Sequence, residues 1–125
     1  MTVSATVSSN CTVTTAPVTF VSNYSGAATN GSGTVTTTCA AGLTPALDID
    51  GGGNAVGNQR SMINGAALLR YDLFSDAART TAWDPSSSVS VATGVVATTV
   101  YARIPASQNV AALTYTDSVT VTVTY

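Results

Sequence analysis

The sequence SVTVTVTY, residues 118–125, decides the fold class of this chain. Val119, Val121, Val123 and Tyr125 alternate with serine and threonine, so an extended backbone here has one apolar and one polar face. Valine and threonine also favour the pleated, half-buried surface of a sheet. We therefore predict a β-strand with one face in the core and the other in water.

The first residues of the chain repeat this alternation, with Val3, Ala5 and Val7 separated by serine and threonine. Between the two segments, short strand-forming runs are divided by clusters of Gly, Asn, Asp and Pro. Many short strands with frequent turn signals predict an all-β antiparallel sandwich, with a barrel as the alternative. We expect further strands at 11–21, 33–39, 46–49, 68–74, 80–83, 89–92 and 95–104, turns at 30–33, 51–54, 64–65 and 84–86, and one helical turn at 75–79 capped by Ser75.

Length and composition bound the number of domains and exclude some classes of function. The 125 residues predict one domain, and only 8% of them are charged, against roughly 25% in an average globular chain. A net charge of −2 with four scattered arginines provides no basic patch that could bind nucleic acid. We expect no membrane span, because no apolar run approaches the roughly 18 residues that one needs. The start of the chain lacks the features of a signal peptide, so we expect either a cytosolic protein or the processed form of an exported one.

The residue types present argue against catalysis. The chain has no histidine and no lysine, which removes the commonest general base and the usual Schiff-base residue. A serine nucleophile would need another base, and there is no G-x-S-x-G elbow. We therefore expect no enzyme activity, no catalytic residue and no cofactor.

The segment around Asp48 and Asp50 resembles the opening of a calcium loop, followed by glycines and Asn54. The rest of such a loop is absent, in particular its distant glutamate. We interpret these side chains as parts of a turn and expect no metal site. Likewise, we interpret the aromatic residues as core and core-edge packing, and expect the arginines to pair with aspartates or loop carbonyls.

Cys11 and Cys39 are the two cysteines, 28 residues apart. They could form a disulfide, a redox couple or two buried thiols. Their spacing does not fit a C-x-x-C motif, and no further cysteine or histidine could complete a zinc site. We expect a disulfide, which indicates the periplasm or the extracellular space.

A family resemblance is carried by LRYDLFSDAARTTAW, residues 69–83. This run resembles the signature of spore coat protein U domains, which are the pilins of archaic chaperone–usher pili. Other matches follow in the family's order: Cys11 and Cys39, Asp50-Gly51-Gly52, Arg60-Ser61-Met62, Tyr101-Ala102-Arg103-Ile104-Pro105-Ala106 and Tyr115-Thr116-Asp117-Ser118-Val119-Thr120-Val121. The resemblance implies an immunoglobulin-like sandwich that lacks one strand. In that family a periplasmic chaperone first holds the open groove, and the N-terminal strand of the next subunit then fills it.

The alternating segments at the two ends of the chain agree with this implication. We predict that residues 1–9 form a donor strand, with Val3, Ala5 and Val7 buried in a neighbouring subunit, and that residues 10–125 form the pilin sandwich. An uncovered apolar edge is a hazard that strand addition from another chain removes. The predicted acceptor groove is lined by Val13, Val119, Val121, Val123 and Tyr125.

These expectations describe an exported structural pilin that polymerises on the cell surface and supports adhesion and biofilm formation. Its expected partners are identical or related subunits, the periplasmic chaperone and the outer-membrane usher. A tip adhesin domain and a spore or cell coat protein of the same fold are the alternatives. The room for a single domain favours a shaft subunit over an adhesin.

Overall fold

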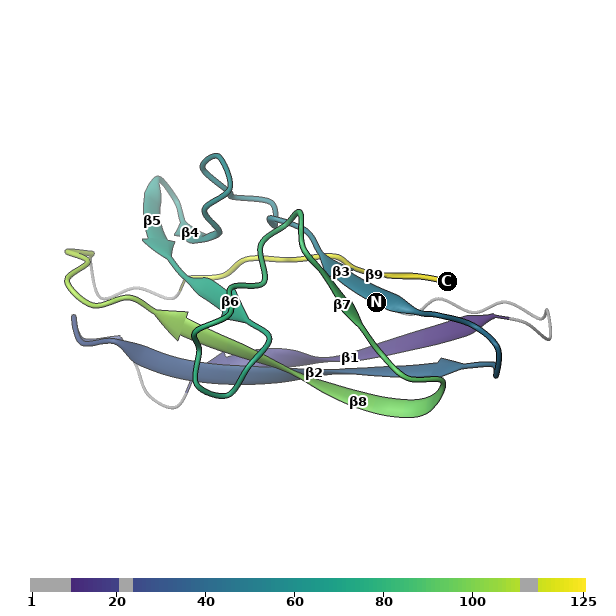
Figure 1. Cartoon of the computed structure of the whole chain (residues 1–125). Helices are drawn as coiled ribbons and strands as arrows, with labels where there is room; N and C mark the ends of the chain where they lie inside the picture. Colours follow the sequence, from purple (N-terminus) through teal and green to yellow (C-terminus); the bar gives the residue numbers. More distant parts are fainter. Residues whose placement is uncertain (1–9, 21–23, 111–114) are drawn as a thin grey trace.

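The structure is a computed structural model that describes residues 10–20, 24–110 and 115–125. All regular structure in these residues is β, and they contain no helix (Figure 1). The strands are β1 (Cys11–Phe20), β2 (Thr29–Cys39), β3 (Ala46–Ile49), β4 (Ser61–Asn64), β5 (Ala67–Arg70), β6 (Asp72–Phe74), β7 (Ser88–Ser90), β8 (Gly94–Ile104) and β9 (Val121–Thr124).

These strands form two facing layers. One sheet has the order β1-β2-β8-β6, the other has the order β7-β3-β9, and β4 and β5 form a separate hairpin. Every strand pair is antiparallel. In Figure 1 the three-stranded sheet lies over the long strands β1, β2 and β8. The predicted all-β antiparallel sandwich is therefore confirmed.

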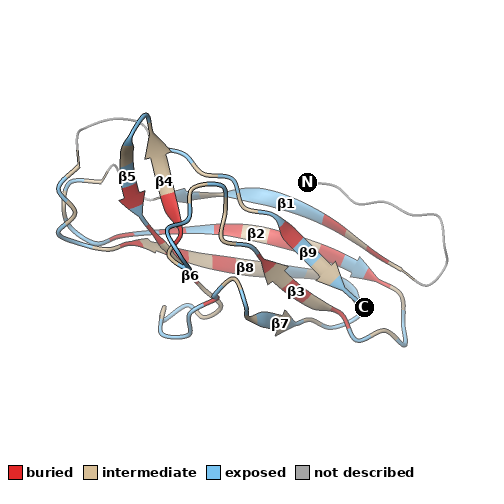
Figure 2. Ribbon diagram, turned by 90° about the horizontal axis from the view of Figure 1, so that it is seen from above, coloured by how far each residue is buried: buried red, intermediate tan, exposed pale blue. Residues whose placement is uncertain are grey.

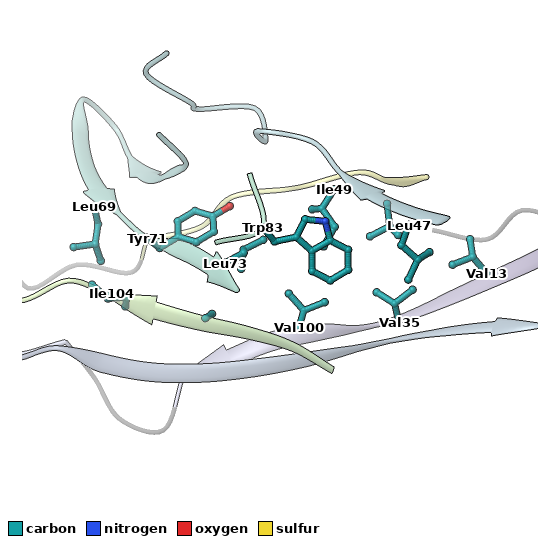
Figure 3. Packing of buried hydrophobic residues seen from close by; sticks show 12 residues of the cluster. Val13, Val35, Leu47, Ile49, Leu69, Tyr71, Leu73, Trp83, Val100 and Ile104 are labelled. Carbon is teal, nitrogen blue, oxygen red and sulfur yellow. The ribbon is translucent and has the colours of Figure 1, made fainter. Parts of the chain in front are cut away.

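The core lies between the two sheets. Trp83 is its largest fully buried side chain, and Figure 3 shows the indole between the layers, above Val100. Val35 and Val100 come from the four-stranded sheet, and Leu47 and Ile49 come from the opposite sheet. Along β2, polar residues on the outer face (Asn30, Ser32, Thr34, Thr36 and Thr38) alternate with buried residues that include Val35, so the period-2 pattern of the sequence places one face of the strand in the core.

The expected turn at 30–33 is wrong, because these residues lie inside β2. Gly31 and Gly33 face inward, where the end of β1 passes very close to β2. A Cβ atom at Gly31 would lie 2.5 Å from the Thr19 carbonyl oxygen, and one at Gly33 would lie 2.9 Å from Val18 Cγ2. These glycines therefore permit the close approach of two strands instead of forming a turn.

The region between 61 and 83 differs from the expectation in three ways. Strand β4 was not predicted, the expected strand at 68–74 is interrupted at Tyr71, and the expected strand at 80–83 contributes only a bridge between Phe74 and Ala82. The expected helical turn at 75–79 is a non-helical turn. Its cap is Asp76, whose carboxylate accepts hydrogen bonds from the backbone N–H groups of Thr80 and Thr81. A hydrogen bond from the Thr80 hydroxyl, together with these backbone bonds, lowers the pKa of Asp76.

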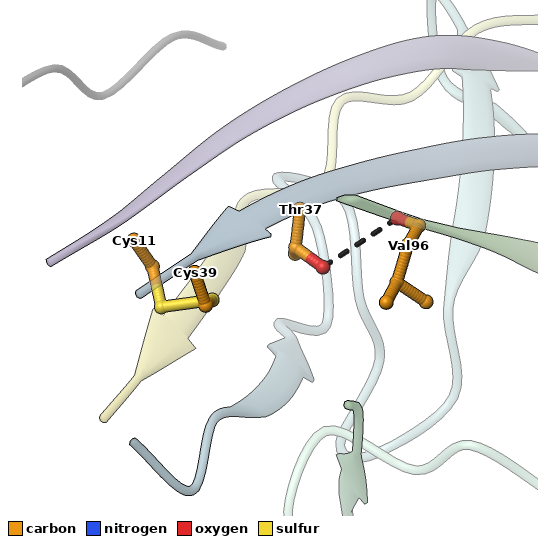
Figure 4. Close-up of a disulfide and its surroundings, with 4 residues drawn as sticks. All are labelled: Cys11, Thr37, Cys39 and Val96. Atoms are coloured by element: carbon orange, nitrogen blue, oxygen red, sulfur yellow. Dashed lines mark hydrogen bonds between the residues drawn. A yellow bond between two sulfur atoms is a disulfide. The ribbon is translucent and has the colours of Figure 1, made fainter. Parts of the chain in front are cut away.

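Cys11 and Cys39 form the expected disulfide, which joins directly opposite positions of β1 and β2 (Figure 4). We predict that native protein will be lighter by about 2 Da than the reduced protein, as one two-electron bridge requires. Replacing both cysteines by serine should lower the free energy of unfolding by about 3–4 kcal/mol, because the cross-link restricts the unfolded chain. Free thiols in native protein would contradict this bond.

Candidate binding groove

Within the part of the chain that the structure describes, two sheet edges without a further paired strand border the same side of the sandwich. β1 is the last strand of the four-stranded sheet, and β9 is the last strand of the three-stranded sheet. Cys11 and Val13 at the start of β1 are each 1% exposed, whereas residues 14–17 are exposed. Figure 2 shows this change along β1, whose middle is pale blue. The sandwich is thus closed at the disulfide end and open beyond Val13.

A cavity of about 290 Å³ lies along this opening. One wall comes from the second half of β1, where the pairing with β2 shifts between Ala16 and Thr19. Pro17 lies in this irregular part, and proline is tolerated there because the outer side of an edge strand needs no N–H donor. The opposite wall comes from residues 117–121. The apolar side chains of the lining are Ala16, Pro17, Val18, Phe20, Val35, Ile49, Met62, Tyr71, Leu73, Val100, Val119 and Val121.

The turn at 50–53 holds the wall at 117–121 in place. Backbone bonds join Asp50 N–H to the Thr120 carbonyl and Gly53 N–H to the Ser118 carbonyl. The Asp50 carboxylate also accepts bonds from the N–H groups of Gly52, at 3.0 Å, and Thr120, at 2.8 Å. The interpretation of Asp50 as a turn residue is confirmed by these bonds, which keep residues 118–120 extended ahead of β9.

The structure distributes the predicted acceptor residues over four environments. Val119 and Val121 line the cavity. Val13 is buried in the core, Val123 is half-buried against it, and Tyr125 is 53% exposed. The role of all five in accepting a strand remains a prediction. The predicted donor residues Val3, Ala5 and Val7 lie outside the described residues.

From the strand that begins at Cys11, only Val13 was predicted as a groove residue, and the second half of that strand was not. Ala16, Val18 and Phe20 line the cavity from this strand. They alternate along the expected strand at 11–21, but Pro17 interrupts the alternation of apolar and polar residues, so the sequence does not mark them as one face of a groove. Met62, from the unpredicted β4, also lines the cavity and has no sequence signal of its own.

One end of the groove is polar. Tyr71 donates its hydroxyl to Asp117 Oδ2 at 2.5 Å, and Asn54 donates its side-chain N–H to Oδ1 at 2.9 Å. Gly52 packs on the same carboxylate, with φ +80° and a Cβ position that would overlap Oδ2. Burial of Tyr71 raises its pKa, and the hydrogen bond to Asp117 raises it further. The phenol therefore stays protonated and remains a donor to the carboxylate.

The family model of the Spore Coat Protein U domain matches residues 1–122 of this chain. The chain belongs to the spore coat protein U domain family. No curated protein matches the sequence. Among solved structures, this spore coat protein U domain matches a chain in the CsuC–CsuE chaperone–tip adhesion subunit pre-assembly complex from the archaic chaperone-usher Csu pili of Acinetobacter baumannii, with a TM-score of 0.72 and 22% sequence identity. The match covers 93% of the present chain and 39% of the other, so the present chain spans well under half of that protein's length.

Outside the groove, Arg60 joins several segments of this spore coat protein U domain. The residue is 4% exposed, and its guanidinium donates to the backbone carbonyls of Ile49, Asp50 and Trp83 at 2.6–2.9 Å. Burial lowers the pKa of Arg60, while nearby acidic groups oppose that shift. The expectation that arginines bind loop carbonyls is confirmed for Arg60, through Asp50 and Trp83, and for Arg79, through Ala77. Arg79 also donates to two strand carbonyls, those of Gly31 in β2 and Ala102 in β8.

We predict that Arg60→Met will lower the free energy of unfolding by about 3 kcal/mol, because three buried carbonyls lose a charged donor. Arg60→Lys should recover only part of this loss, since an ammonium cannot reproduce the planar fork of the guanidinium. Urea unfolding of the three proteins measures the difference. A methionine variant as stable as the parent would show that Arg60 does not hold these segments together.

The described residues contain no group of three or more His, Cys, Asp or Glu side chains placed to hold a metal. Asp48 accepts from the Ser88 hydroxyl, and Asn54 is bonded to Asp117. Over the same residues, no helix is long and apolar enough to cross a membrane.

Proposed function

We propose that this chain is a structural subunit of a bacterial chaperone–usher surface fibre and that it polymerises by accepting a strand from a second copy. The observation that carries this proposal is the apolar groove between the free edges of β1 and β9. In a monomer with this groove, apolar core side chains contact water and backbone N–H and C=O groups at the sheet edges lack a protein partner. An inserted strand would bury these side chains and bond these backbone groups, which lowers the free energy of the folded state. Membership of the spore coat protein U family and the fold of the matched pilus structure support the same function.

The proposed occupant is residues 1–9 of another subunit. They directly precede β1, and Val3, Ala5 and Val7 offer an apolar face with the period of a strand. Nine extended residues span about 30 Å, enough to follow β1 and the segment leading into β9. Because the donor and the groove are different surfaces, the contact is head-to-tail and the assembly is an open filament.

The proposed pathway runs through the periplasm. The disulfide between Cys11 and Cys39 fits an oxidising compartment. The matched complex joins a chaperone to a pilus subunit, and we propose that a periplasmic chaperone likewise covers the groove of this chain before an outer-membrane usher exports it. The fibre would then act in adhesion and biofilm formation without catalysing a reaction or holding a cofactor.

A tip position is the second candidate, because the matched complex contains a tip adhesion subunit. Electron microscopy of cells that express the chain with its chaperone and usher tests both candidates. Immunogold labelling along whole fibres would support a shaft subunit, and labelling at fibre ends alone would support a tip subunit. Cells that export the chain without fibres would overturn the proposed function and favour a coat protein.

A further inference from the structure

The inward face of the segment that leads into β9 begins with a charged residue. Asp117, Val119 and Val121 line the groove and are at least partly buried, whereas residues 116, 118 and 120 are exposed, although Ser118 also borders the groove. Along this wall, an inserted strand would therefore face one carboxylate, that of Asp117, and then the apolar side chains of Val119 and Val121. Tyr71 and Asn54 hold this carboxylate, so its position is defined before any strand arrives.

The Asp117 carboxylate has acceptor capacity left for the occupant. An ionised carboxylate offers about four lone-pair sites. Among residues 10–20, 24–110 and 115–125, Tyr71 and Asn54 occupy one site each, on different oxygens. An inserted strand would displace water from this end of the groove, and an apolar side chain placed there would leave the remaining capacity unsatisfied. The groove therefore favours an occupant with a hydrogen-bond donor opposite Asp117.

The proposed donor strand carries such a residue in the required phase. Its apolar series of Val3, Ala5 and Val7 continues, two residues later, with Ser9. We propose that the Ser9 hydroxyl of one subunit binds the Asp117 carboxylate of the next and thereby sets the register of the inserted strand. This inference rests on the proposed function. Antiparallel alignment then places side chains of like polarity opposite each other: Ser9 with Asp117, Val7 with Val119, Ala5 with Val121, and Val3 with Val123.

Other alignments lose this match. A shift of two residues keeps the same face inward but sets Val7 against the Asp117 carboxylate. A shift of one residue turns the apolar side chains away from the groove. A parallel strand with the same ends would bring Val3 beside Val119 and would move Ser9 to the end at Tyr125. One polar pair thus distinguishes the proposed register from its neighbours.

Cysteine pairs in full-length subunits test this register, since opposite Cβ atoms in an antiparallel pair lie about 4.5–5.5 Å apart. Filaments of the variant with Val7→Cys and Val119→Cys should form a disulfide-linked ladder on a non-reducing gel. Filaments with Val3→Cys and Val119→Cys should not. A ladder from the second pair alone, or from neither pair in intact filaments, would overturn the register but leave the proposed function standing. A parent chain that forms no filaments in cells would overturn the proposed function itself.

A second test avoids new cysteines. Ser9→Ala should raise the rate at which filaments dissociate in denaturant by about tenfold or more, because a hydrogen bond to a charged group is lost. Ser8→Ala is the matched control on the opposite face of the strand and should change the rate by less than about twofold. Equal rates for the two variants would overturn the role of Ser9.

Discussion

Replacing Val7 by aspartate is expected to abolish filaments while leaving the subunit folded and bound to its chaperone. In the proposed fibre the new carboxylate would enter the apolar part of the groove, opposite Val119, without a partner. Burial of an unpaired charge costs several kcal/mol, which is enough to prevent strand exchange. Electron microscopy scores the filaments, and co-purification with the chaperone shows that the subunit is intact.

Thr6→Asp is the matched control for this variant. It adds the same charge at the adjacent position, on the face of the donor strand that points away from the groove. We expect filaments from this control. Normal filaments from Val7→Asp would show that residues 1–9 do not donate the strand.

The second large effect is expected from supplying the missing strand within the same chain. A copy of residues 2–9, added after Tyr125 through a short flexible turn, can fold back antiparallel to β9 and fill the groove. Burying its apolar side chains and pairing both free edges should raise the melting temperature by at least about 10 °C, since each kcal/mol shifts the midpoint by several degrees in a domain of this size. The same variant should not polymerise, because its groove is occupied.

A matched variant separates the filled groove from the mere addition of residues. Its added strand carries aspartate in place of the copied Val7, and we expect the melting temperature of the unmodified chain. If both extended variants melt like the parent, the sandwich is already complete without a donor.

Much of the fold could be predicted because alternation is a local property. The long strands β1 and β8 and the short β3 lie within about a residue of the expected positions, and the cysteine pair could be inferred from composition. The 64–65 turn was also visible, and it joins β4 to β5 with Gly65 at φ +59°. Each of these features depends on a few neighbouring residues.

The errors arise where distant segments determine the local conformation. Asn30-Gly31-Ser32-Gly33 has the composition of a turn, but β1 on one side and β8 on the other hold it extended. Tyr71 has the sequence context of a strand, yet it separates β5 from β6 and sends its hydroxyl to Asp117, 46 residues later. Such contacts leave no signal in local propensity.

In the groove, too, some residues could be predicted from local alternation and others depend on contacts between distant segments. Val119 and Val121 could be named from the terminal alternation, and both line the cavity. The polar end could not be foreseen, because it joins Asn54, Tyr71 and Asp117 from three separate segments. The wall that β1 contributes depends on a shift in the pairing of β1 with β2, and no sequence pattern predicts this shift.

Hydrogen exchange of the full-length chain, compared between filaments and the chaperone-free monomer, tests the central claim most directly. Amides at the free edges, in residues 14–20 and 118–124, should exchange much more slowly in filaments, because an inserted strand would bond them. Strand β7, at the opposite edge of its sheet, serves as the internal control and should be unchanged. If assembly protects β7 or other surfaces but leaves residues 14–20 and 118–124 as they are in the monomer, the groove does not accept a strand and the proposed assembly is wrong.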